Sequence, residues 1–274
     1  MVKLMGADQV YFYVFGATDG MMKVLRHYEA QMFVDWRTLT LPGEYQPNVR
    51  SLYNFYYQNL IVVFSIFSSR IKAKFWPEEL IELNDCLYRN IHRHDYLAVI
   101  DIDEVPLPQK ADNWHELLQS ATDQLSEQKQ QRAAYFENRH AYVYEMFEDT
   151  EMPKPNEQVP IPDYLYMFRH VNRVPVFSPG LNIKCFHRTD QVFAVHNHFP
   201  MRCINTTGHH SCTGMTFDPS ESILMHYRRN VPPPTNCSTP DNLKECTVRD
   251  TNVWRFFDQV AAKVESQLLS IFVS

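Results

Sequence analysis

The first 101 residues alternate between apolar runs typical of strands and amphipathic patterns typical of helices. The runs at residues 10–15, 33–42 and 96–101 are rich in β-branched and aromatic side chains. Apolar residues at helical spacing separate them, over residues 20–30 and again over 77–89. Strand, helix, strand, helix, strand is the order of an α/β domain. We therefore predict an α/β fold with a mainly parallel central sheet flanked by helices.

The remainder of the chain indicates a smaller, β-containing region rather than a continuation of this alternation. A helix pattern spans residues 112–125, and a strand-like stretch follows at 133–147. Two short strands around a turn are predicted within residues 181–199, and a closing helix over 253–272. The sequence contains no internal repeat, so we predict a single domain.

Charge and hydropathy argue against two broad classes of protein. The formal net charge is −6 with a pI near 6.0, whereas nucleic-acid binding usually requires a clustered basic face. We therefore expect no nucleic-acid partner. The longest apolar run, residues 60–67, is far shorter than the roughly 18–20 residues that span a bilayer.

Cysteine usage in the last third of the chain favours an oxidising compartment. Of the six cysteines, four lie between residues 203 and 246, in Pro- and Thr-rich sequence typical of loops: Cys203, Cys212, Cys237 and Cys246. Acceptor triplets for N-glycosylation begin at Asn205 and Asn236 in the same region. Such triplets also occur by chance, and the spacing does not define the disulfide pairing. Together these features favour a secretory location with disulfide bonding.

The third apolar run ends in three acids, Asp101, Asp103 and Glu104. In an open α/β sheet, ligands bind beyond the carboxyl ends of the strands. Because Asp101 and Asp103 are two residues apart, extended backbone would point both carboxylates to one side and Ile102 into the core. Adjacent carboxylates repel unless a cation shares them, and an oxygen-preferring divalent ion, Mn²⁺ or Mg²⁺, suits that role. A solvated surface turn is the alternative interpretation.

Two enzyme classes place an acidic pair after an apolar strand. One is the metal-dependent nucleotide-sugar transferase of the GT-A fold. The other is the haloacid-dehalogenase-type phosphatase, with Asp101 as nucleophile and Asp103 as acid/base. That motif normally opens its domain, whereas about 100 residues precede it here, and a later acidic group at 148–151 runs into prolines. A third alternative is a catalytically inactive, transferase-like protein that binds glycans.

Four segments, taken in order, resemble glycosyltransferase family 92, which was once catalogued as a domain of unknown function. They are "LNDCLYRN" (83–90), "YLAVIDIDEVPLP" (96–108), "NIKCFHRTDQVFAVHNH" (182–198) and "LMHYRR" (224–229). The opening "LMGADQVYFYVF" (4–15) is similar to the same family. The resemblance covers roughly residues 4–229, which is most of the chain.

This resemblance implies a GT-A-like hexosyltransferase on the lumenal side of the Golgi membrane, with a membrane-anchored full-length form. It would move a sugar, galactose in characterised members, from a UDP-sugar donor to a glycan or glycoprotein acceptor, with inversion. Bond cleavage leaves charge on the diphosphate, which a bound Mn²⁺ or Mg²⁺ stabilises. Carried onto this chain, the metal ligands would be Asp101, Asp103 and His226. The donor-binding residues would be Asn84, Asp85 and Lys184, and no residue is assigned as the catalytic base.

The resemblance also divides the chain and indicates two departures from the family pattern. Residues 1–110 correspond to the nucleotide-binding half, and residues 111–274 to a smaller acceptor half. Family members carry an anchor, a stem, and a further strand and helix before the segment that opens this sequence. We therefore expect an N-terminal truncation that removes the first strand–helix unit. Residues 59–79 interrupt a direct connection to the Asn-Asp-Cys helix, so we expect an insertion there.

Overall fold

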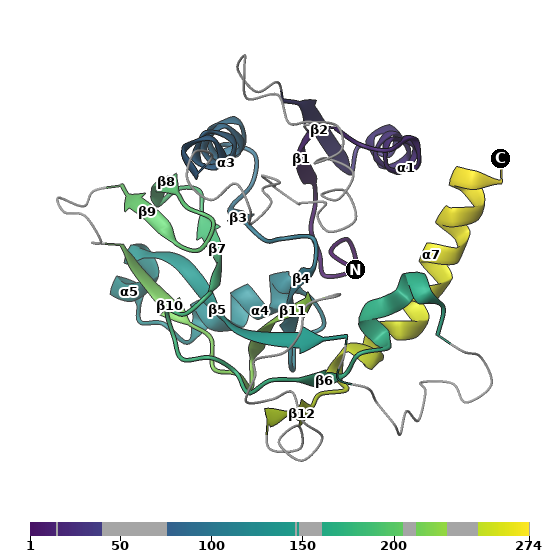
Figure 1. Cartoon of the computed structure of the whole chain (residues 1–274). Helices are drawn as coiled ribbons and strands as arrows, with labels where there is room; N and C mark the ends of the chain where they lie inside the picture. The colour runs from purple at the N-terminus through teal and green to yellow at the C-terminus, as the bar shows by residue number, and fades with distance from the viewer. Residues whose placement is uncertain are drawn as a thin grey trace.

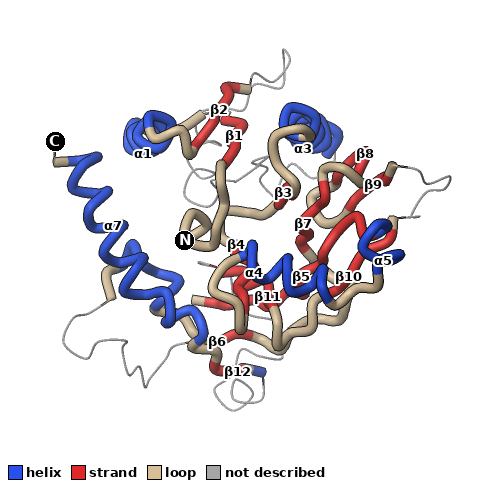
Figure 2. The backbone as a smooth tube through the Cα atoms, turned by 180° about the vertical axis from the view of Figure 1, so that it is seen from behind, coloured by secondary structure: helices blue, strands red, loops and turns tan. Residues whose placement is uncertain are grey.

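The computed structural model describes residues 1–14, 16–39, 76–145, 147, 161–204, 212–228 and 246–273. These residues form a mixed α/β structure, which Figure 1 shows from the front and Figure 2 from behind. The strands are β1 (Val10–Val14), β2 (Val34–Thr38), β3 (Tyr96–Ala98), β4 (Glu104–Pro108), β5 (Ala133–Tyr144), β6 (Asn172–Arg173), β7 (Lys184–Arg188), β8 (Val192–Val195), β9 (Pro200–Cys203), β10 (Thr213–Thr216), β11 (Ser222–Arg228) and β12 (Val248–Arg249). The helices are α1 (Asp19–Ala30), α3 (Trp76–Asn90), α4 (Trp114–Asp123), α5 (Glu127–Arg132) and α7 (Phe257–Phe272), with 3₁₀ segments η2 (Asp163–Phe168) and η4 (Asn252–Phe256).

The larger sheet has eight strands in the described chain and mixes both directions. β5 lies at its centre, with β6, β7, β10 and β11 as partners. β11 runs parallel to β5 but antiparallel to β4, and β7 runs antiparallel to both β5 and β3. Most of the pairings are antiparallel, so the prediction of a mainly parallel central sheet is wrong. The mixed α/β class is confirmed.

The three strands predicted within the first 101 residues do not form one sheet, because they pair with different partners. β1 and β2 pair in parallel, with Val10 opposite Val34, as a separate two-stranded sheet. The third run contributes only β3, which pairs antiparallel with β7, so that Leu97 lies opposite His187. The partner of β3 therefore comes from far along the chain. Periodicity within the first 101 residues carries no information about it.

β1 is nevertheless buried on both of its faces. Phe12 and Val14 lie in the main core together with Ile100. Tyr11 and Tyr13, on the opposite face, belong to a second buried cluster. An apolar strand without polar alternation is expected to be covered on both sides. In Figure 1, helices α1 and α3 flank this small sheet.

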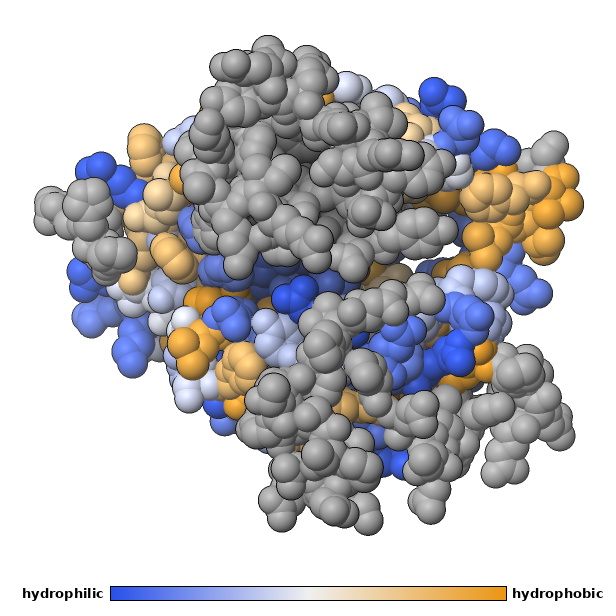
Figure 3. Space-filling model, in the orientation of Figure 1, coloured by the Kyte–Doolittle hydropathy of each residue, from blue (hydrophilic) through white to orange (hydrophobic). Residues whose placement is uncertain are grey.

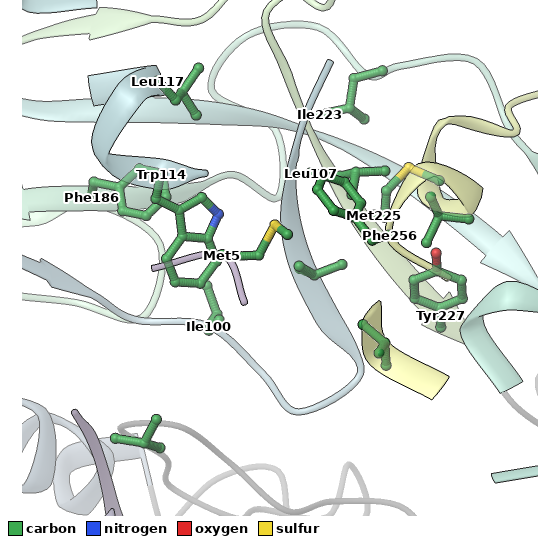
Figure 4. Close-up of a cluster of buried hydrophobic side chains, with 14 of the residues drawn as sticks. Met5, Ile100, Leu107, Trp114, Leu117, Phe186, Ile223, Met225, Tyr227 and Phe256 are labelled. Carbon is green, nitrogen blue, oxygen red and sulfur yellow. The ribbon is translucent and has the colours of Figure 1, made fainter. Parts of the chain in front are cut away.

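Helix α4 fixes the two strands that carry the candidate site. Its N-terminus is capped by Asn113, whose side chain accepts a hydrogen bond from the backbone N–H of Glu116 at 2.9 Å. Trp114 packs edge-on against Phe186 of β7, with ring centroids 5.3 Å apart (Figure 4). Its indole N–H donates to the carbonyl of Pro106 in β4 at 2.7 Å. One buried side chain thus holds β4 beside β7.

The closing helix predicted from the sequence is η4 followed by α7. Leu269, Phe272 and Val273 are exposed near its end, where Figure 3 shows apolar side chains at the surface. Within the described ranges, every helix is too short or too polar to cross a bilayer.

A disulfide joins Cys203 to Cys212, which confirms that this chain forms a disulfide in its structure. Cys86 and Cys185 are buried thiols. The glycosylation candidates Asn205 and Asn236 lie outside the described residues, as does most of the expected insertion, residues 59–75. The last residues of that segment, 76–79, begin helix α3.

Candidate metal and donor site

The acidic segment forms a turn rather than extended backbone. The N–H of Glu104 donates to the carbonyl of Asp101 at 3.0 Å, and β4 begins at Glu104. Ile102 is 38% exposed, so the prediction that it points into the core is wrong. A turn breaks the alternation of side chains that extended backbone would give. Asp101 and Asp103 consequently contact different cations.

Lys184, the first residue of β7, contacts two of the acids. Its Nζ lies 3.2 Å from Oδ1 of Asp101 and 3.3 Å from Oε2 of Glu104. It also donates to the side-chain oxygen of Asn197. The lysine side chain is 0% exposed. Because an ammonium has three N–H donors, these three acceptors satisfy it completely.

His226 contacts the other side of the same group of acids. Its Nε2 lies 3.2 Å from Oδ2 of Asp103, and its Nδ1 lies 3.0 Å from Oε1 of Glu104. β11 and β4 place these residues together, because His226 is opposite Glu104 in their antiparallel register. The N–H of Tyr227 donates to the carbonyl of Asp103 at 2.7 Å and fixes the turn against β11.

Asp101, Lys184, Glu104, His226 and Asp103 therefore form a continuous series of alternating charges, which we call the charge cluster. Burial alone would raise the pKa of Glu104, but Lys184 and His226 on either side hold it well below its usual range. Burial lowers the pKa of His226, yet Glu104 and Asp103 outweigh burial and raise that pKa to about 9. Glu104 is thus an anion held between two cations.

The open side of the charge cluster fits a divalent ion. Two neighbouring ligands of an octahedral ion at about 2.1 Å would lie about 3 Å from each other. The 3.2 Å between Oδ2 of Asp103 and Nε2 of His226 matches that spacing. Carboxylate and imidazole are both accepted by Mn²⁺. The side chains of Asp101 and Asp103 are 33% and 22% exposed, so an ion and its remaining ligands could approach from solvent.

A second, deeper group of metal-ligand residue types lies behind His226. Glu104, His140 and His226 are all buried, and one ligand atom from each lies within 4.8 Å of the others. Nε2 of His140 is 2.8 Å from Nδ1 of His226. Burial and the neighbouring His226 lower the pKa of His140 to about 3, so this ring is neutral.

The family comparison assigns the chain as a whole. The sequence model of glycosyltransferase family 92 matches residues 1–264, which includes every member of the charge cluster. The chain belongs to glycosyltransferase family 92. No match was found among curated proteins. As a family 92 member the chain is a transferase, and its family implies a sugar donor and a glycan acceptor.

Two of the donor-binding residues expected from family 92 lie in helix α3, where each has a local partner. Asn84 accepts from the backbone N–H of Val195 at 2.9 Å and donates to its carbonyl at 3.0 Å. Asp85 accepts from the hydroxyl of Tyr13 at 2.6 Å and from Nε of Arg89 at 2.6 Å. In the described chain neither side chain bonds to the charge cluster. Their donor-binding role stays a prediction.

The structure adds site residues that the sequence did not assign. Glu104 joins both cations, Asn197 completes the contacts of Lys184, and His140 lies against His226. Glu104 and Asn197 fall within segments that resemble family 92, so their neighbours in sequence gave a signal. His140 lies on β5, outside those segments. Only the register of β5 beside β11 brings it to the site.

A separate groove has a volume of about 1480 Å³. Its lining includes Gln9 before β1, Tyr96 at the start of β3, Trp114 on α4 and Arg188 at the end of β7. No member of the charge cluster lines it. The charge cluster lies elsewhere, where the turn after β3 meets the first residues of β4 and β7 and His226 of β11. Size alone therefore does not identify the candidate site of this family 92 protein.

Proposed function

We propose that this family 92 transferase uses Mn²⁺ or Mg²⁺ to move galactose from a UDP-sugar to a glycan acceptor, with inversion. The observation that carries the proposal is the pair formed by Oδ2 of Asp103 and Nε2 of His226, 3.2 Å apart at a turn beyond a buried strand. Galactose, UDP and inversion come from the family resemblance. The metal comes from the ligand types and their separation.

In this proposal Asp103 and His226 hold the ion directly. When bound, the ion would supply positive charge to the diphosphate as the sugar leaves. Lys184 has a different role from the direct donor contact expected from the sequence. Its three donors are directed at Asp101, Glu104 and Asn197, so it positions the acids rather than contacting phosphate. Asp101 is paired with Lys184 and its side chain is 33% exposed, and its expected role as a third metal ligand stays a prediction.

A second positive charge lies beside the pair. Arg228 follows His226 by two residues on β11, and alternate residues of a strand lie on the same face. Its guanidinium lies over the ring of Tyr142 at 5.2 Å, an arrangement that restrains the side chain. We propose that Arg228 contacts the diphosphate, because a planar guanidinium binds phosphate oxygens in bidentate fashion.

Inversion requires a base that takes the proton of the acceptor hydroxyl. Glu104 is unsuited to this role. Both of its oxygens face cations, its side chain is 2% exposed, and its pKa lies well below the usual range. The base therefore belongs to another carboxylate on the acceptor side.

The alternatives retained from the sequence are distinguished by one assay. Purified protein is incubated with UDP-galactose, Mn²⁺ and acceptor glycans, and UDP release is measured. We expect UDP release by the wild type, and a rate of UDP release at least about 100-fold lower in Asp103→Asn. Asp112→Asn is the matched control, because the Asp112 side chain is 83% exposed. Release of phosphate in the absence of a nucleotide sugar would favour the phosphatase. Binding of glycans without turnover would favour the inactive, transferase-like protein.

We also propose a Golgi location for the chain, on the lumenal side, with a membrane-anchored full-length form. The disulfide between Cys203 and Cys212 supports an oxidising compartment. Tagged full-length protein should co-localise with Golgi markers. Enzymatic removal of N-glycans should lower its apparent mass, and Asn205→Gln with Asn236→Gln should abolish that change. A cytosolic protein without N-glycans would contradict the proposal.

A further inference from the structure

Glu104 lies behind His226, on the side of the imidazole ring away from Asp103. Its Oε1 is 3.0 Å from Nδ1, while Nε2 of the same ring is 3.2 Å from Oδ2 of Asp103. Histidine ligands of metals usually donate their second ring N–H to a carboxylate or carbonyl, which fixes the tautomer and the ring orientation. Resting on the proposed function, we propose that Glu104 is a positioning residue: it accepts from Nδ1–H of His226, so that release of the Nε2 proton when an ion binds would leave the Nε2 lone pair directed toward that ion.

The carboxylate of Glu104 is itself fixed. Its Oε2 accepts from the backbone N–H of Asp101 at 2.8 Å and lies 3.3 Å from Nζ of Lys184. The register of β4 against β11 places Glu104 directly opposite His226. The other oxygen, Oε1, therefore remains in place to accept from the histidine ring. A buried acceptor restrained at both oxygens is suited to orient a ligand.

His140 is a second neighbour of Nδ1 of His226, at 2.8 Å, and it could reverse the assignment. If His140 donated from Nε2, Nδ1 of His226 would present a lone pair toward the anionic Oε1 of Glu104, which is repulsive. If His226 donates from Nδ1, Oε1 of Glu104 and Nε2 of His140 both lie within reach as acceptors, and the carboxylate is the stronger acceptor. The second arrangement satisfies both contacts. It leaves Nε2 directed at Asp103.

The ion could in principle lie among Glu104, His140 and His226 instead. That position is closed, because all three residues are buried. The Asp103 side of the ring is partly exposed, so it can also admit a diphosphate. In a transferase that uses a nucleotide-sugar donor, the divalent ion must leave some of its coordination positions open for the phosphate oxygens of the donor. The geometry therefore assigns the ion to Nε2 and the positioning contact to Nδ1.

Glu104→Gln tests this assignment with a change of one atom. Lys184 and the N–H of Asp101 both require an acceptor at the position of Oε2. The amide oxygen of Gln will occupy that position, which directs the NH₂ group at Nδ1 of His226. The histidine then accepts at Nδ1 and carries its proton on Nε2, where a metal would bind. The variant should therefore present the wrong tautomer to the ion.

Mn²⁺ binding is measured by the EPR signal of the remaining aqueous ion, without donor or acceptor. We expect Kd to rise by about 10–100-fold in Glu104→Gln. Glu137→Gln is the matched control, because Glu137 is also buried but accepts from the N–H of Gly180, away from the charge cluster. Its Kd should stay within about twofold of the wild type. His140→Phe, which keeps a ring in place, should change Kd by no more than about threefold.

Two results would overturn the positioning role: wild-type affinity in folded Glu104→Gln, or loss of binding in His140→Phe, which would put the ion in the buried group. If Glu104→Gln does not fold, NMR of ¹⁵N-histidine-labelled wild type with bound diamagnetic Zn²⁺ identifies which ring nitrogen of His226 carries the proton. A proton on Nδ1 of His226 supports the role, and a proton on Nε2 refutes it. Wild type that binds no Mn²⁺ would instead refute the proposed function, whatever the variants do.

Discussion

His226 on β11 and Lys184 on β7 both contact the carboxylate of Glu104, through Nδ1 at 3.0 Å and through Nζ at 3.3 Å. Each of these cations also reaches one of the two aspartates of the turn. Glu104 is therefore the common anion of the charge cluster, although it is the acid least exposed to solvent. The stability of the charge cluster, and the metal binding that we propose for it, depend on this arrangement.

Removal of the buried lysine should destabilise the protein strongly. Lys184→Met leaves Glu104 buried without one of its two cations and leaves Asp101 without its partner. We expect the free energy of unfolding to fall by about 3–5 kcal/mol, measured by urea denaturation. Lys110→Met is the control, because Lys110 is exposed and its ammonium donates to the hydroxyl of Ser220 at 3.5 Å, away from the charge cluster. A loss below about 1 kcal/mol in Lys184→Met would show that the ion pairs contribute little.

The sequence predicted the members of the site better than their arrangement. The resemblance named Asp101, Asp103, His226 and Lys184, and the structure brings these four together. It did not reveal that the acids form a turn, because hydrophobic periodicity describes the strand before them and not the residues after it. The roles of these residues as ligands remain predictions.

The fold shows the same limit. Local patterns identified β1, β2 and the helices between the strands, since those signals lie within a few residues. Strand direction in the larger sheet depends on pairing between segments far apart, such as β3 with β7 and β4 with β11. Single-sequence periodicity carries no such information. His140 was missed for the same reason, because only strand register places it beside His226.

Acid should destabilise the protein partly through His187. This residue is fully buried on β7, neither ring nitrogen has a hydrogen-bond partner among the described residues, and burial lowers its pKa to about 3. In the unfolded chain the His187 ring binds a proton as the pH falls through about 6.5, whereas in the folded chain it binds one only near pH 3. This contribution to stability is therefore complete above pH 6.5 and is lost progressively as the pH falls below it.

When the pH is lowered from 7 to 4, the free energy of unfolding should consequently decrease less for His187→Leu than for the wild type. Denaturant titrations at several pH values measure that difference. His92→Leu, a substitution of an exposed histidine outside β7, is measured alongside as the control. Identical slopes for wild type and His187→Leu would show that the buried ring does not titrate as its burial predicts.

Reduction should destabilise the protein through one short loop. The disulfide between Cys203 and Cys212 closes a sequence separation of 9 residues. Loop-closure entropy for such a length predicts a loss of about 2–3 kcal/mol when the bond is absent. We expect this loss in Cys203→Ser with Cys212→Ser under oxidising conditions. If the paired substitution left the unfolding midpoint unchanged, the disulfide would contribute nothing to stability.

The guanidinium geometry of Arg228 should affect turnover more than metal affinity. Its guanidinium lies over the ring of Tyr142. In our proposal it contacts the diphosphate and not the metal ion. Arg228→Lys keeps the charge but loses bidentate geometry, so we expect kcat to fall by about 10-fold or more with Mn²⁺ affinity unchanged. Kinetics with UDP-galactose and the Mn²⁺ titration separate the two quantities. A parallel loss of metal affinity would argue that Arg228 supports the charge cluster instead.

Pulsed EPR of Mn²⁺ bound to ¹⁵N-histidine-labelled protein measures most directly whether His226 coordinates the proposed ion. We predict a ¹⁵N coupling from one histidine that disappears in His226→Gln, together with a ³¹P coupling when UDP is added. Bound Mn²⁺ that shows no histidine coupling in the wild type, or keeps it in His226→Gln, would contradict the account.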